Sequence, residues 1–150
     1  MITLQAINDF LSVKDLAIAG VSRDRKKFGF MVFQELKKKG YNLYPVNPNA
    51  DIIDDTKCYK SVSEIPANLT NLYIVTAKEN TVQILRDAIE KGIRNVWIQQ
   101  KSDTPEAINL AKEKGVNLIY GECIIMFLSP SESFHKFHRF IRRLFGGMPR

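Results

Sequence analysis

Short apolar runs and amphipathic segments alternate along this chain. The apolar runs cover residues 16–20, 41–46, 72–75, 95–98 and 116–120. Three segments between them have apolar residues at helical spacing, and each is followed by a glycine: residues 28–39, 81–91 and 105–114. Continuous apolar strands that alternate with glycine-terminated helices are typical of parallel sheets. The sequence therefore predicts an α/β fold, a doubly wound Rossmann-like parallel sheet of about five strands with helices on both faces.

Composition indicates one ordinary globular domain. The 150 residues are 45% hydrophobic and 25% charged, and we expect a single domain over residues 1–150. No apolar run is long enough to span a bilayer, and the N-terminus lacks the basic-then-apolar order of a signal peptide. Two distant cysteines, Cys58 and Cys123, fit free thiols better than a disulfide framework. We expect a cytoplasmic protein without a transmembrane segment.

The positive charge is concentrated at the C-terminus. The formal net charge is +6, and residues 134–150 hold five of the 22 Lys and Arg residues and no acid. The remainder is nearly neutral, with 17 basic against 16 acidic residues, which argues against nucleic acid as a partner of the domain. The spacing of the aromatic residues predicts a basic amphipathic helix within residues 133–145. This helix either covers the sheet or binds a membrane surface, an RNA or a protein.

The loop after the first apolar run has the features of a phosphate site. Gly20, Val21 and Ser22 leave the strand, basic residues follow, and a helix opens at Phe28. A glycine permits close backbone approach, and the free N–H groups of a helix N-terminus attract an anion. Ser22 supplies a hydroxyl donor, and the basic side chains, Lys26 among them, supply charge-assisted bonds to phosphates. The alternative is a solvated turn, but the strand–loop–helix context favours the phosphate site.

The motifs of the common dinucleotide and ATP sites do not occur. The first loop lacks the G-x-G-x-x-G spacing, and the chain has no G-x-x-x-x-G-K-[ST]. The second strand ends in Pro45-Val46-Asn47-Pro48, where an NAD enzyme would place the acid that holds a ribose hydroxyl, and Asp51 comes late. These features count against NAD and ATP as the ligand.

Several motifs occur together in the order found in one family. They are Gly20-Val21-Ser22, Gly40-Tyr41, Pro45-Val46-Asn47-Pro48, Tyr59-Lys60-Ser61-Val62 with Ile65-Pro66, Gly92 with Val96-Trp97-Ile98-Gln99, and Cys123. From about Leu11 to Met126 the chain resembles the small stand-alone CoA-binding domain proteins, which are similar to the N-terminal domain of succinyl-CoA synthetase α chains. The resemblance implies a Rossmann-like fold that holds coenzyme A across the ends of the first strands. It does not imply thioester synthesis, because the chain stops where the synthetase continues into the domain with its phosphorylated histidine.

The same resemblance assigns site residues by position. Nine positions match: Gly20, Val21, Ser22 and Lys26 for the phosphates, Asn47 and Pro48 for the adenosine side, and Val75, Thr76 and Ala77 for the pantetheine arm. Two features depart from the family pattern. Its tryptophan motif commonly ends in glycine, where this chain has Lys101, and the first loop carries more basic residues than usual.

Catalytic groups are weaker signals in this sequence. His135 and His138 lie three residues apart in the expected last helix, which is too few ligands for a metal site. Cys123 follows the fifth strand, where a thiol could exchange with the CoA sulfur, but a free cysteine is more often a small buried residue. The sequence therefore favours a non-catalytic CoA-binding module, a sensor or carrier of CoA or acyl-CoA. The alternatives are an enzyme that uses NAD(P) or another nucleotide, and an interaction protein that uses its basic C-terminal helix on nucleic acid or membrane.

Overall fold

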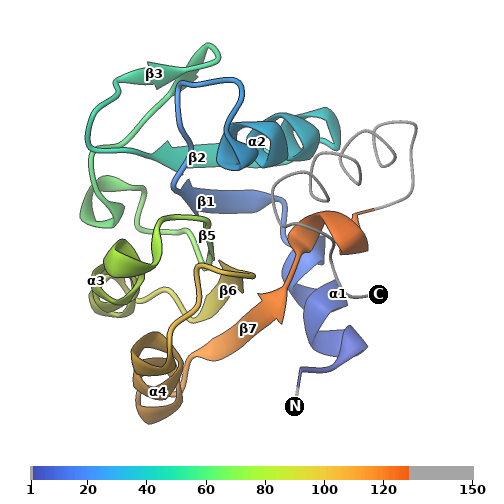
Figure 1. Ribbon diagram of the computed structural model, residues 1–150, viewed down its shortest axis with the longest axis vertical. Helices are drawn as coiled ribbons and strands as arrows, with labels where there is room; N and C mark the ends of the chain where they lie inside the picture. The colour runs from blue at the N-terminus through green and yellow to red at the C-terminus, as the bar shows by residue number, and fades with distance from the viewer. Residues whose placement is uncertain (1, 129–150) are drawn as a thin grey trace.

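The computed structural model describes residues 2–128 and is built around a five-stranded parallel sheet (Figure 1). The strands are β1 (Asp15–Ala19), β2 (Asn42–Val46), β5 (Asn71–Ile74), β6 (Asn95–Gln99) and β7 (Asn117–Glu122). The helices are α1 (Leu4–Ser12), α2 (Phe28–Lys38), α3 (Lys78–Lys91) and α4 (Pro105–Glu113). The smaller elements are a hairpin of β3 (Ile52–Ile53) and β4 (Thr56–Lys57), and the 3-10 helices η1 (Val62–Glu64) and η2 (Ile124–Phe127).

The order of the strands defines where the winding of the chain reverses. The strands lie in the order β2-β1-β5-β6-β7, and all neighbours are parallel. The chain moves outward from β1 to β2 and then returns to pair β5 with the other side of β1. In doubly wound sheets, ligands bind beyond the carboxyl ends of the strands at this reversal. The predicted fold class is confirmed.

The sheet separates two apolar cores because successive strand residues point to opposite faces. Ile18, Tyr73 and Trp97 belong to the core under α1 and α2, whereas Leu72 and Val96 belong to the core under α3 and α4. Figure 1 shows these two helix pairs on opposite sides of the sheet. Covering both faces leaves the two ends of the strands as the open surfaces of the sheet.

The first helix and the β3–β4 hairpin are additions to the predicted element order. α1 is stabilised locally at its start, where the Thr3 hydroxyl accepts a hydrogen bond of 3.1 Å from the Ala6 N–H. In the hairpin, Asp54 and Asp55 have φ angles of 48° and 62°, a conformation that aspartate tolerates better than most residues. Strands of two residues are too short to show a periodicity, so the sequence pattern could not predict the hairpin.

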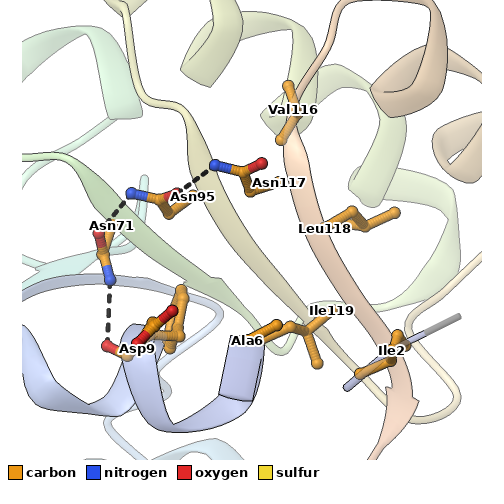
Figure 2. A pocket seen from close by; sticks show the side chains of 10 residues that line it. Ile2, Ala6, Asp9, Asn71, Asn95, Val116, Asn117, Leu118 and Ile119 are labelled. Carbon is orange, nitrogen blue, oxygen red and sulfur yellow. Dashed lines mark hydrogen bonds between the residues drawn. The ribbon is translucent and has the colours of Figure 1, made fainter. Parts of the chain in front are cut away.

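A row of asparagines closes the amino end of the sheet (Figure 2). Asn117 Nδ2 donates to Asn95 Oδ1 at 2.9 Å, and Asn95 Nδ2 donates to Asn71 Oδ1 at 3.1 Å. Asn71 Nδ2 in turn donates to the Phe10 carbonyl of α1 at 3.1 Å. The row borders a pocket of about 500 Å³, which we call the amino-end pocket. The asparagine amides at this pocket therefore hydrogen-bond one another and connect α1 to the sheet.

Some predictions concern residues beyond the described range. The expected amphipathic helix within residues 133–145, together with His135 and His138, lies outside the described residues. Within residues 2–128, no helix combines the length and the apolar character needed to cross a membrane.

Candidate functional site

Two adjoining pockets lie at the carboxyl end of the sheet, where the winding reverses. The β2-side pocket, of about 500 Å³, is bordered by the loops after β1, β2 and β5 and by α3. The β6-side pocket, of about 640 Å³, is bordered by the loop after β1, the start of α2 and the loop after β6. Gly20, Ser22, Val75 and Thr76 line both pockets, so the two meet across the ends of β1 and β5.

All nine predicted site residues line these pockets. Eight of them border the β2-side pocket: Gly20, Val21, Ser22, Asn47, Pro48, Val75, Thr76 and Ala77. Lys26 borders the β6-side pocket. The structure thus brings together residues from three separate loops, and their contact with a ligand stays a prediction.

Gly20 of the first loop and Gly29 in the first turn of α2 are required by the protein itself. Gly20 has a φ of 106°, and a Cβ there would lie 2.7 Å from the backbone carbon and oxygen of Val75. A Cβ on Gly29 would lie 2.7 Å from the Gly20 carbonyl oxygen. Close approach of β5 and α2 to the loop therefore explains both glycines without a bound anion, which refines the reason that the sequence alone suggests.

The loop after β1 is shaped by two local side-chain bonds. The Asp24 N–H donates to Ser22 Oγ at 3.0 Å, and the Lys26 N–H donates to Asp24 Oδ1 at 2.9 Å. Ser22 keeps its hydroxyl hydrogen for another acceptor. Asp24 places a carboxylate among the basic residues of the β6-side pocket, so the loop is less positive than a count of its bases alone suggests.

Helix starts at the two pockets differ from the helix start farther along the sheet. The N-cap residues of α2 and α3, Lys27 and Ala77, make no side-chain hydrogen bond to the first turn. At α4, by contrast, the Thr104 side chain accepts a hydrogen bond from the Ala107 N–H. Uncapped first turns direct backbone N–H groups and positive helix-dipole charge towards the groove.

Asn47 holds two loops together at the wall of the β2-side pocket. Its Nδ2 donates to the Val21 carbonyl at 2.9 Å, and its Oδ1 accepts from the Asn49 N–H at 2.8 Å. The amide therefore connects the loop after β1 to the loop after β2. This positioning role was not part of the prediction, which placed Asn47 at the adenosine side.

A buried hydroxyl network supports the other side of the groove. Ser102 Oγ donates to the Thr76 carbonyl at 2.7 Å, and Thr81 Oγ1 donates to the Ser102 carbonyl at 2.7 Å. Thr81 and Ser102 are 0% and 5% exposed. Because these bonds connect the loop after β5, the first turn of α3 and the loop after β6, they fix the relative positions of the two pockets.

Gln99, the last residue of the Val96-Trp97-Ile98-Gln99 motif, is a buried polar residue of the β6-side pocket. Its Oε1 accepts from the Tyr73 hydroxyl at 2.8 Å and from the Ile124 N–H at 3.2 Å. Its Nε2 lies beside the Cys123 thiol, a weak acceptor, and has no oxygen or nitrogen acceptor among the described residues, although the side chain is 1% exposed. A buried amide donor with only a thiol beside it is weakly satisfied, which makes Gln99 the strongest site residue that the prediction left out.

The Cys123 thiol is poorly placed for exchange chemistry. Cys123 is 3% exposed, and burial raises the pKa of its thiol, an effect that the neighbouring Gln99 amide only partly opposes. Burial also raises the pKa of Tyr73 well above its usual value. Since the thiolate is the reactive form, these groups form a neutral core beneath the groove, and the thiol-exchange hypothesis loses support.

Lys101 has a backbone conformation that normally favours glycine. Its φ is 74°, in the left-handed region that L-residues with a side chain rarely adopt. This explains why a glycine suits the position in the family pattern. In this chain the side chain of a lysine lines the β6-side pocket instead.

Groups that could hold a metal ion are missing from the described part of the chain. No cluster of three or more His, Cys, Asp or Glu side chains occurs within residues 2–128. The arrangement is that of a doubly wound Rossmann-like domain with a groove at its reversal point, where apolar side chains are combined with backbone, amide, hydroxyl, carboxylate and ammonium groups.

Comparison with known proteins specifies the family. The model of the CoA-binding domain family matches residues 14–129. The chain belongs to the CoA-binding domain family, as the resemblance in its motifs predicts.

Relatives of this chain include parts of large ligases and small separate proteins. The α subunit of acetate–CoA ligase (ADP-forming) II from Pyrococcus furiosus is 32% identical over 126 residues, which cover 77% of this chain and 28% of that subunit. The uncharacterized protein YneT from Bacillus subtilis is 28% identical over 111 residues, covering 74% of this chain and 82% of YneT. The solved structure of a conserved hypothetical protein from Pyrococcus furiosus has a TM-score of 0.74 and 31% identity, and the match covers 76% of this chain and 98% of that one. The chain thus spans about a quarter of the ligase subunit.

Proposed function

We propose that this protein binds coenzyme A or an acyl-CoA in the groove formed by the two pockets and acts as a non-catalytic sensor or carrier. The observation that carries the proposal is the convergence of the loops after β1, β2 and β5 on one groove at the winding reversal of a CoA-binding family domain. CoA is long, with an adenosine end, a central pyrophosphate and a pantetheine arm. Two pockets that meet at a short middle section suit such a ligand.

The groups along the groove indicate how CoA would be oriented in it. The middle section has the Ser22 hydroxyl and lies beside the uncapped start of α2, with Lys26 and Lys27 on the β6 side. Hydroxyl, ammonium and backbone N–H donors are suited to a pyrophosphate. The β2-side pocket then receives the adenosine, as it does in other doubly wound domains. The β6-side pocket, which shares Val75 and Thr76 with it, receives the pantetheine arm, whereas Ala77, also predicted for that arm, lines only the β2-side pocket.

The non-catalytic part of the proposal rests on the groups in and beneath the groove. The buried Cys123 thiol has a raised pKa, and the buried Gln99 amide offers a hydrogen bond rather than a proton or a nucleophile. The ligase relatives are several times longer than this chain, and a ligase activity is not part of the proposal. A cytoplasmic location stays a prediction, in keeping with two buried free thiols.

Thermal unfolding with CoA, acetyl-CoA, NAD, NADP and ATP in parallel tests the proposal. At a ligand concentration of about 100 times Kd, binding stabilises the native state by about 2.7 kcal/mol. For a chain of this length, that raises Tm by roughly 5–10 °C. We expect the shift with CoA and acetyl-CoA and not with the other three ligands. A shift with NADP alone would support the dinucleotide enzyme instead.

A double variant tests whether the predicted loop carries the binding. Ser22→Ala with Lys26→Ala removes a hydroxyl and an ammonium from the middle of the groove, and we expect CoA affinity to fall at least tenfold. Lys112→Ala in α4 is a control that loses a charge on the helix covering β6 and β7. If the double variant bound CoA as tightly as the parent, the assignment of this loop to the phosphates would be wrong.

A further inference from the structure

Lys60 lies at the place where a ribose is recognised in doubly wound domains. Tyr59 pairs with Val46, the last residue of β2, and the Tyr59 N–H donates to the Pro45 carbonyl at 2.8 Å. The Asn47 N–H donates to the Tyr59 carbonyl at 2.9 Å. These bonds place Tyr59 beside the last residues of β2. Lys60, the next residue, therefore lies at the carboxyl end of the sheet. Lys60 lines the β2-side pocket together with Asn47.

The charge of Lys60 is opposite to the one that a ribose diol requires. An NAD enzyme places a carboxylate near the end of the second strand, where it accepts hydrogen bonds from the ribose hydroxyls. An ammonium group has three donors and no acceptor, so it suits a phosphate better than a hydroxyl. CoA differs from NAD and ATP at this point because its ribose carries a 3′-phosphate.

The Lys60 ammonium is held by weak partners. Its Nζ lies 2.8 Å from Asp51 Oδ1 and donates to the Ala50 carbonyl at 3.3 Å. The Lys60 and Asp51 side chains are 47% and 87% exposed, and exposed ion pairs contribute little to stability. The Asp51 carboxylate therefore keeps Lys60 beside the pocket. Breaking this ion pair so that Lys60 can bind a more highly charged phosphate costs little free energy.

Two cations, Lys60 and Arg23, act on the Asp51 carboxylate. The Lys60 hydrogen bond and charge, and to a smaller extent the Arg23 charge, hold the pKa of Asp51 below its ordinary value. Arg23 directly follows Ser22 of the groove. Arg23 therefore adds positive charge near Asp51, on the side of the groove where Lys60 lies.

We propose that Lys60 binds the 3′-phosphate of CoA and thereby determines the preference of this groove for CoA over nucleotides that lack that phosphate. The inference rests on the proposed function, since it assigns one part of the ligand to one residue of the same groove. Asp51 acts as a competitor that releases Lys60 when the phosphate enters.

Isothermal titration of the full chain with CoA and with 3′-dephospho-CoA tests the assignment. The parent protein should bind CoA about tenfold to hundredfold more tightly than 3′-dephospho-CoA, as expected for a charge-assisted hydrogen bond. Lys60→Met should reduce this ratio to about threefold or less and leave the affinity for 3′-dephospho-CoA unchanged. Lys57→Met, an exposed neighbour outside both pockets that loses the same charge, should keep the parent ratio.

Asp51→Asn supplies a test of opposite sign. Without the competing carboxylate, CoA should bind a few times more tightly, whereas 3′-dephospho-CoA should bind as before. A parent protein that binds the two ligands equally would overturn the assignment of Lys60 and leave the proposed function intact. Lys60→Met weakening both ligands by the same factor would also overturn it. Failure of the parent protein to bind CoA at all would contradict the proposed function itself.

Discussion

The two ends of the sheet carry pockets of similar size made from different groups. The amino-end pocket and the β2-side pocket each enclose about 500 Å³. At the amino end, the asparagine row satisfies its own hydrogen bonds (Figure 2), and no Lys or Arg lines the pocket. At the carboxyl end, Lys60 lines the β2-side pocket and three further lysines line the adjoining one: Lys26, Lys27 and Lys101.

The direction of the strands explains this difference. In a parallel sheet with helical crossovers, each strand runs into the N-terminus of the next helix, so the positive ends of the helix dipoles gather at the carboxyl end of the sheet. The helices end near the amino end, where glycines such as Gly92 and Gly115 terminate them in left-handed conformations. Pocket volume alone therefore does not distinguish a structural hollow from an anion site, whereas the lysines of the lining and the direction of the helix dipoles do.

The largest loss of stability should come from Gly20, where the first loop passes close to the Val75 backbone. Gly20→Ala places a Cβ 2.7 Å from the Val75 backbone at a φ of 106°, and we expect a loss of about 3 kcal/mol or more in the free energy of unfolding. Gly92→Ala is the matched control, because its φ is 91° and its Cβ would meet nothing within 4 Å. That variant should lose only about 1 kcal/mol. Urea unfolding measures both, and equal losses would mean that the loop can move away from β5.

Breaking the asparagine row should lower stability without changing binding. Asn71→Ala removes a fully buried amide that bonds the Phe10 carbonyl and Asn95, and we expect a loss of about 2 kcal/mol. Asn117→Ala, at the exposed end of the row, should lose less than about 1 kcal/mol. CoA affinity of both variants should match that of the parent. A large drop in affinity for Asn71→Ala would show that the two ends of the sheet are coupled.

Replacing Lys101 by glycine should raise stability and lower CoA affinity. Lys101→Gly relieves a side chain at a φ of 74°, so Tm should rise by an amount equivalent to about 1 kcal/mol. Because a charge leaves the β6-side pocket, affinity for CoA should fall a few fold. Lys114→Gly is the control, since its φ of −94° is ordinary and glycine there should lower stability. A fall in Tm for Lys101→Gly would mean that the contacts of the lysine outweigh its backbone strain.

The smallest effect concerns the titration of Asp51. Its folded-state pKa lies below the ordinary value because of Lys60, so any stability from this pair is present above the ordinary pKa and is lost as the pH falls through the folded-state pKa. In Lys60→Met, the Asp51 pKa measured by NMR should rise towards the ordinary value, and Tm at neutral pH should not change measurably. An unchanged pKa in that variant would mean that the pair does not form in solution.

Much of the groove was predictable because its residues follow the ends of strands. Gly20, Asn47 and Val75 lie far apart in the chain, yet parallel pairing brings the strand ends together at one end of the sheet. What each side chain does there was less predictable. The use of Asn47 to join two loops depends on hydrogen bonds between segments that are distant in sequence. The burial of Gln99 depends on packing under η2, and no local pattern reports it.

By itself, the amino-acid sequence determined the succession of strands and helices and the positions where helices end. Periodicity and glycine preference are local properties that can be read within one or two turns of a helix. Tertiary structure decided which loops form the groove and that Lys60 is held by Asp51. It also decided that the asparagines satisfy one another, while the Gln99 amide donor has only the Cys123 thiol beside it. These outcomes depend on burial and on pairing between distant segments, because a polar group acquires or lacks a partner only when the sheet is assembled.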